Sequence, residues 1–112
     1  MELLDIVVDE RAGWSVLELV GQLDVATAPE LRQALQEAQY GGGARVVVDL
    51  TRVEFLDSFG LGVLVGGLKR ARLQGGRFVL AGAGPRVQRI FEVTGLDSSF
   101  RQVAHVEELG SS

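Results

Sequence analysis

The stretch that decides the fold runs from Asp49 to Gly62 and reads DLTRVEFLDSFGLG. It begins in the apolar, β-branched run 45–50, which is typical of a central strand covered on both faces. It then crosses a short loop that carries two hydrophobic residues, Val53 and Phe55, and places Asp57 and Ser58 directly before an apolar helical segment. Aspartate and serine are both good helix N-caps. The stretch therefore predicts a strand, a loop and the start of a helix.

The flanking segments continue an alternation of strands and helices. Apolar and β-branched runs predict strands at 3–8, 14–20, 45–50, 77–81 and, as a short edge strand, 100–104. Apolar residues at helical spacing, followed by glycines, predict helices at about 28–40, 58–73 and 85–94, with one further turn at 106–109. Thr27 and Glu30 are expected to cap the first helix reciprocally. The polar segment 9–13 is expected to be an open hairpin loop, and 110–112 a frayed end.

This order of elements predicts the fold class. Strands that alternate with helices favour an α/β fold, in which helices pack on a mixed, largely parallel sheet of four to five strands. The chain of 112 residues is long enough for one domain, spanning 1–112, and too short for two. Sites in such sheets gather beyond the carboxyl ends of the strands, which draws attention to the turns after Leu50 and after Ala81.

Composition limits the classes of function. The chain has no cysteine and one histidine, His105, which excludes a disulfide framework, a thiolate metal site and a histidine-rich metal site. Its net charge of -4 argues against nucleic acid as a partner. The acidic amino terminus and the lack of a long apolar run argue against a secretory signal and a membrane helix. The cytoplasm is the expected location.

Three interpretations of the chain as an enzyme do not fit the residues that each of them requires. Gly60, Gly62 and Gly66 resemble a dinucleotide-binding fingerprint only superficially, because they lie inside the expected helix and no acid ends the next strand. Gly62 and Gly66 are better explained as small residues that let the helix approach the sheet. Segment 82–85 lacks the lysine and hydroxyl of a phosphate loop. Ser58 with His105 as its base lacks the Gly-x-Ser-x-Gly elbow of a hydrolase. No enzymatic activity is expected.

What remains is the Ser58 hydroxyl at the start of a helix. The simplest interpretation is a helix cap with no other role. Ser58 also makes physical sense as a substrate, because a phosphate there would meet free backbone N–H groups and the positive end of the helix. The phosphate would add about -1.5 to -2 charges beside Asp57 and would repel a partner that covers the site.

Four motifs in this order resemble the STAS domain, and specifically the small single-domain bacterial anti-sigma factor antagonists. They are GQLD at 21–24, VVVDL at 46–50, FLDS with GLG at 55–62, and VQRIF with GL at 87–96. The likeness covers nearly the whole chain. It departs from the family at Phe59, where family members commonly carry a second small hydroxyl residue, and the carboxyl-terminal helix is shorter than usual.

The resemblance implies a partner switch. Ser58 would be phosphorylated by a cognate anti-sigma factor, a serine kinase with a histidine-kinase-like ATP fold, and a metal-dependent serine phosphatase would reset it. The unphosphorylated protein would bind the anti-sigma factor and free the sigma factor. Nucleotide and magnesium belong to the partner, so no cofactor is expected in this chain. On geometry and this likeness, the expected partner-binding residues are Asp24, Thr27, Asp57, Ser58, Phe59, Gly60 and Gly62.

One alternative of another class stays open. The chain could be a STAS module that docks constitutively in a larger complex, such as a lipid-transport or stress-sensing assembly, with Ser58 serving only as a cap. The switch predicts that Ser58→Ala keeps partner binding and Ser58→Asp abolishes it. The docking module predicts that neither substitution matters much.

Overall fold

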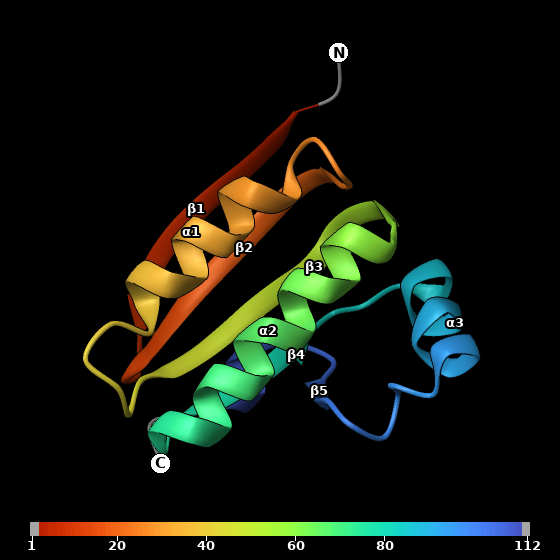
Figure 1. Cartoon of the computed structure of the whole chain (residues 1–112). Coiled ribbons are helices and arrows are strands. Elements are labelled where there is room, and N and C mark those ends of the chain that lie inside the picture. The colour runs from red at the N-terminus through yellow and green to blue at the C-terminus, as the bar shows by residue number, and fades with distance from the viewer. Residues whose placement is uncertain (1–2, 111–112) are drawn as a thin grey trace.

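The computed structural model describes residues 3–110, and within them the chain forms one five-stranded sheet and three α-helices (Figure 1). The strands are β1 (Leu4–Arg11), β2 (Trp14–Leu23), β3 (Arg45–Leu56), β4 (Arg77–Ala81) and β5 (Arg101–Val103). The helices are α1 (Ala28–Ala38), α2 (Ser58–Gln74) and α3 (Pro85–Thr94), followed by the 3-10 turn η1 (Val106–Glu108). The order of elements is the predicted one. Of the end expected to fray, residues 111 and 112 lie outside the described part of the chain.

The sheet keeps its strands in chain order, β1-β2-β3-β4-β5. The pair β1–β2 is antiparallel and the remaining pairs are parallel, so the predicted mixed, largely parallel sheet is confirmed. The hairpin is tighter than predicted, because pairing continues to Arg11 opposite Trp14 and leaves only Ala12 and Gly13 in the turn. Both turn residues have positive φ, 53° and 86°, as in the two-residue turns that match the twist of a hairpin.

Strand β3 is twice as long as the predicted run 45–50, and this is the main correction to the sequence interpretation. The predicted loop around Val53 and Phe55 is strand, with Val53 opposite Gly21 and Phe55 opposite Gln22. The polar residues 51, 52 and 54 break the apolar pattern, so local propensity does not reveal the continuation. Because β2 also extends to Leu23, the two strands end side by side, with Leu23 paired to Leu56.

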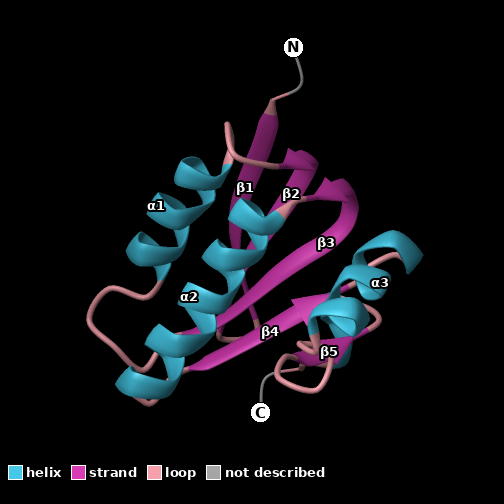
Figure 2. Cartoon of the chain, turned by 45° about the vertical axis from the view of Figure 1, so that its right-hand side comes forward, coloured by secondary structure: helices cyan, strands magenta, loops and turns pink. Residues whose placement is uncertain are grey.

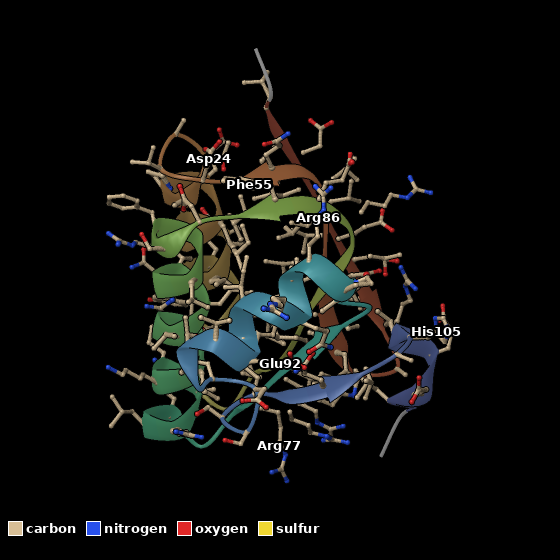
Figure 3. All side chains as sticks on the ribbon, turned by 90° about the vertical axis from the view of Figure 1, so that its right-hand side faces the viewer. Asp24, Phe55, Arg77, Arg86, Glu92 and His105 are labelled. Carbon is tan, nitrogen blue, oxygen red and sulfur yellow. The ribbon has the colours of Figure 1, made fainter. Side chains whose placement is uncertain are left out.

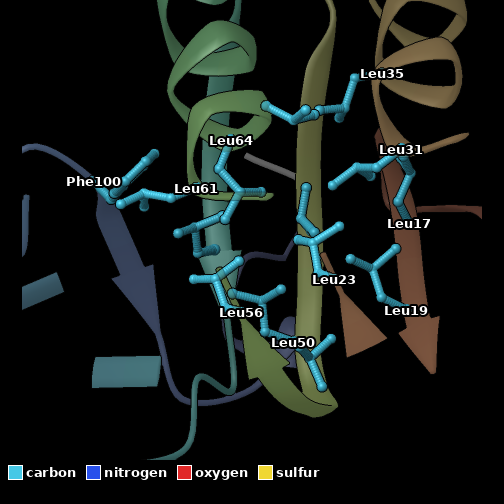
Figure 4. Packing of buried hydrophobic residues seen from close by; sticks show 14 of the residues in the cluster. Leu17, Leu19, Leu23, Leu31, Leu35, Leu50, Leu56, Leu61, Leu64 and Phe100 are labelled. Atoms are coloured by element: carbon cyan, nitrogen blue, oxygen red, sulfur yellow. The ribbon is translucent and has the colours of Figure 1, made fainter. Parts of the chain in front are cut away.

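All three helices pack on one face of the sheet, and Figures 1 and 2 show α1 and α2 running side by side across it. Figure 4 shows how their leucines interlock with those of the strands. One cluster joins the buried residues of the helices, including Leu31, Leu35, Leu61, Leu64, Val87 and Phe91, to Leu17, Leu19, Leu23, Leu50 and Leu56 of the sheet. On the opposite face, η1 lies over a smaller cluster that comprises Trp14, Val16, Val47, Val79, Ala81, Val106 and Leu109. The central strands are therefore covered on both faces.

Two glycines let α2 approach the layer beneath it. A Cβ on Gly60 would lie 2.6 Å from Leu23 Cγ, and a Cβ on Gly67 would lie 2.6 Å from Phe78 Cε1. The packing role predicted for Gly62 and Gly66 is wrong, because a Cβ on Gly62 would meet nothing within 4 Å and one on Gly66 would meet only Arg70 Nη1, at 3.6 Å. Within residues 3–110, no helix is long and apolar enough to cross a membrane.

Candidate functional site

The two connections β2–α1 and β3–α2 meet at one end of the sheet, because the strands before them end as a pair. We define the loop junction as residues 24–27 and 57–60. The backbone N–H of Asp57 donates to Leu23 O over 3.1 Å, so the second connection starts against the end of β2. Figure 3 shows Asp24 and Phe55 at this end of the molecule, far from His105. The sequence-predicted site residues 24, 27 and 57–60 are therefore brought together.

Asp57 joins the two connections through both of its carboxylate oxygens. It is the N-cap of α2, and its Oδ1 accepts hydrogen bonds from the N–H groups of Phe59 (2.9 Å) and Gly60 (3.0 Å). Its Oδ2 accepts a third bond, 3.0 Å long, from the N–H of Val25 in the other connection. Hydrogen bonds to a charged acceptor are stronger than neutral ones. The half-buried Asp57 side chain thus fixes the helix start and ties both connections together.

Asp24 and Thr27 build the first connection from within. Asp24 Oδ1 accepts hydrogen bonds from the N–H groups of Ala26 (2.9 Å) and Thr27 (3.1 Å). Thr27 Oγ1 donates to Gln22 O over 2.8 Å and accepts from the N–H of Asp24 over 3.0 Å. The reciprocal cap predicted between Thr27 and Glu30 is wrong, since the Thr27 hydroxyl serves this turn and not the helix. Thr27 is only 2% exposed, which gives it a supporting role beneath the surface.

Ser58 is the first residue of α2 and is exposed to solvent. Its hydroxyl has no hydrogen bond to another of the described residues, so it is neither a cap nor part of a buried network. The sequence prediction of a reachable serine hydroxyl at an amino-terminal helix edge is confirmed. The expectation that a phosphate would meet free backbone N–H groups is wrong for Phe59 and Gly60, because Asp57 Oδ1 already accepts from both of these N–H groups.

Two exposed apolar side chains belong to residues that donate to Asp57, and we call them the apolar patch. They are Val25, which is 57% exposed, and Phe59, which is 59% exposed, and both are held by their N–H bonds to Asp57. Phe55 is also exposed, but it follows the alternation of β3 and points away from the face on which its neighbour Leu56 packs against the helices. Exposed apolar groups that gather on one surface indicate a site for another protein. Sequence reasoning missed Val25, for which no signal was available, and placed Phe55 in a loop and not on a strand that presents it.

The remaining predicted site residues differ in what they can contact. Gly60 is buried, and a Cβ there would lie 2.8 Å from Leu23 O as well as close to the Leu23 side chain, so its role is to let the helix start against β2. Gly62 is exposed one turn further along α2. The surface of the site therefore consists of Asp24, Asp57, Ser58, Phe59 and Gly62, with Thr27 and Gly60 beneath it.

Within residues 3–110, no hydrogen bond links Ser58 to His105 or to another basic side chain. The backbone N–H of His105 donates to Glu108 Oε2 over 2.8 Å at the start of η1. In the same described residues, no group of three or more His, Asp or Glu side chains is placed to hold a metal ion.

Fold and site together define a small α/β domain that presents a serine hydroxyl and the exposed side chains of Val25 and Phe59 at one end of its sheet. Comparison with protein families gives its place among such domains: the STAS domain model matches residues 5–109. The chain belongs to the STAS domain family.

Known proteins that resemble the chain agree with this assignment. The anti-sigma-B factor antagonist of Listeria monocytogenes is 40% identical over 89 residues, which cover 80% of this chain and 77% of that protein. The anti-sigma-B factor antagonist of Staphylococcus aureus is 38% identical over 88 residues, covering 79% of this chain and 78% of that protein. The crystal structure of an anti-sigma factor antagonist from Mycobacterium paratuberculosis superposes with a TM-score of 0.84 and 31% identity, covering 94% of this chain and 89% of that one.

Proposed function

We propose that this chain is a cytoplasmic anti-sigma factor antagonist controlled by phosphorylation of Ser58. In the unphosphorylated state it binds a cognate anti-sigma factor through the loop junction and the apolar patch, and the sigma factor is released. The anti-sigma factor is a serine kinase that phosphorylates Ser58, and a serine phosphatase reverses the modification. The chain itself performs no catalysis and takes no cofactor, since the nucleotide belongs to the kinase.

The observation that carries this proposal is the exposed, unbonded Ser58 hydroxyl beside Asp57 and the apolar patch. A kinase can reach the hydroxyl without unfolding the helix, and a partner that covers the patch also covers the serine. The relatives named as anti-sigma-B factor antagonists support the same role.

The electrostatics of the junction favour release after phosphorylation. Because Asp57 Oδ1 already accepts from the N–H groups of Phe59 and Gly60, these donors are not free to neutralise a phosphoryl group on Ser58. The added charge of about -1.5 to -2 then lies beside the Asp57 carboxylate and next to an apolar surface. A partner must bury this charge without a counter-charge from the junction. A workable switch needs about 3 to 5 kcal/mol of differential affinity, which one unpaired charge at an interface can supply.

Phosphotransfer and binding assays test the proposal directly. The purified chain is incubated with ATP and candidate anti-sigma kinases, and the modified residue is mapped by mass spectrometry. Affinity for the kinase is then measured for wild type, Ser58→Ala and Ser58→Asp, with Ser98→Asp as a control of equal charge change on an exposed serine of the α3–β5 loop. We expect phosphate on Ser58, binding by Ser58→Ala and by the Ser98 control, and no binding by Ser58→Asp.

Two results would count against the phosphorylation switch. No incorporation at Ser58 with any candidate kinase would remove the modification itself. Equal binding by Ser58→Ala and Ser58→Asp would favour the constitutive docking module, in which the junction binds a partner without a switch.

A further inference from the structure

A polar groove of about 280 Å³ runs between α1 and α2, the two helices that lie side by side in Figure 1. Helix α1 contributes Arg32 and Gln36, one turn apart, and α2 contributes Gly62, Val63, Gly66 and Arg70. Among the described residues that line it there are two arginines and no acidic side chain, although the chain as a whole has a net charge of -4. The groove is therefore a local positive site on an acidic protein.

Arg70 is held in the groove by a buried hydrogen-bond network. Its Nε donates to Gln39 Oε1 over 3.0 Å, and Gln39 Nε2 donates to Gly67 O over 2.9 Å. Gln39 is only 2% exposed, so it anchors the guanidinium from below. Within residues 3–110, Arg70 Nη2 is buried and has no hydrogen-bond partner. Because Nε is used by Gln39 and Nη2 is buried, Nη1 is the donor that the guanidinium presents toward Gly66 in the groove. A carboxylate can accept a strong, charge-assisted hydrogen bond from this fixed donor.

Two residues that line the groove are glycines, although the packing of the fold does not require a residue without a side chain at either position. A Cβ on Gly62 would meet nothing within 4 Å, and one on Gly66 would make only an ordinary contact, 3.6 Å from Arg70 Nη1. Alanine favours a helix more than glycine does, so neither glycine is explained by the stability of this chain. Gly62 stands one turn after Ser58, which makes the groove continuous with the loop junction.

We infer that this groove receives an acidic segment of the anti-sigma partner, whose carboxylate pairs with Arg70 and Arg32 while the junction is covered. The identity of the partner rests on the proposed function; the preference of the groove for a carboxylate-bearing chain does not. A segment of chain, unlike a free anion, spans the distance from the arginines to Ser58 along the glycine floor. The groove thus adds affinity and orientation that do not depend on the serine.

The preference of the groove can be tested without the partner. Amide NMR spectra of the full chain are recorded during titration with hexaglutamate, hexalysine and inorganic phosphate. We expect hexaglutamate to shift the Gly62 and Gly66 amides, and expect the shifts to be lost in Arg32→Glu and kept in Arg89→Glu, a control of equal charge change on the exposed face of α3. No shift, a shift that persists in Arg32→Glu, or an equally strong response to phosphate would overturn the inference.

The partner assay separates this inference from the switch. Loss of a charge-assisted contact in Arg32→Glu should weaken binding to the anti-sigma kinase about tenfold or more, whereas Arg89→Glu should bind like wild type. If Ser58→Asp abolishes binding and Arg32→Glu does not weaken it, the switch stands and the groove is not part of the interface. If Arg32→Glu weakens binding and Ser58→Asp does not, the groove assignment stands and the phosphorylation switch fails.

Discussion

Replacing Asp57 with alanine should measure how much the loop junction depends on one side chain. The substitution removes an N-cap that accepts from the N–H groups of Phe59 and Gly60, and it also removes the bond from Val25. Loss of an aspartate N-cap costs about 1 kcal/mol, within a range of about 0.5–2 kcal/mol. The bond from Val25 to a charged, half-buried acceptor adds about 1 to 2 kcal/mol. We expect Asp57→Ala to lower the free energy of unfolding by about 2 to 3 kcal/mol.

Asp57→Ser separates the two contributions. A serine hydroxyl can accept at the start of α2 but has no second oxygen to reach Val25, so it should recover the cap and not the bridge. Urea unfolding of wild type and both variants, with the slope of the transition compared, gives the free energies. Asp57→Ser should lie about 1 kcal/mol above Asp57→Ala. An Asp57→Ala variant that loses less than about 0.5 kcal/mol, the ordinary effect of a surface substitution, would refute this account of the junction.

Three further comparisons test other parts of the site. Gly60→Ala places a Cβ 2.6 Å from Leu23 Cγ and should lower the free energy of unfolding in urea by about 1 to 3 kcal/mol. Gly62→Ala meets no neighbour and should raise the same free energy by about 1 kcal/mol, so equal effects would contradict the packing described for α2. Thr27→Val should lose about 1 to 3 kcal/mol because it leaves Gln22 O and the Asp24 N–H without partners, and Thr27→Ser should recover most of this in the same assay. Phe59→Ser should change thermal stability by less than about 0.5 kcal/mol, since the ring is 59% exposed, but should weaken partner binding measured by calorimetry; unchanged affinity would remove Phe59 from the interface.

The parts of the fold that depend on local pattern could be predicted from the sequence. Strand β4 and helix α3 have the predicted bounds, because glycines and a proline delimit them, β4 is a continuous apolar run and α3 has one clear helical period. The second half of β3 could not be predicted, since its polar residues are held in the sheet by pairing with β2 and not by their own propensity. The glycines that pack closely in α2 were misassigned for a similar reason. The sequence pattern indicated Gly62 and Gly66, whereas the structure packs Gly60 and Gly67, because tertiary packing decides which side of the helix faces the layer beneath it.

The sequence allowed residues of the candidate site to be placed, but not the hydrogen bonds between them. Asp57 and Ser58 could be placed at a helix start by residue type, and the exposure of Ser58 follows from that position. The bond between Asp57 and Val25 joins residues 32 positions apart, so no local pattern contains it. The same bond brings Val25 to Asp57, to which Phe59 also donates, which is why the apolar patch emerged only from the structure.

The construction of the junction also explains how Phe59 can stand where family members commonly carry a small hydroxyl residue. The contribution of residue 59 to the fold is made by its backbone, whose N–H donates to Asp57 Oδ1, and any residue other than proline can supply that donor. Its ring is 59% exposed, so the side chain is not required for packing. The fold therefore leaves position 59 free to vary, and the phenyl group there enlarges the apolar patch beside Ser58. Under the proposed function, a partner that covers this surface meets an apolar group at position 59, and the Phe59→Ser measurement described above tests whether recognition depends on it.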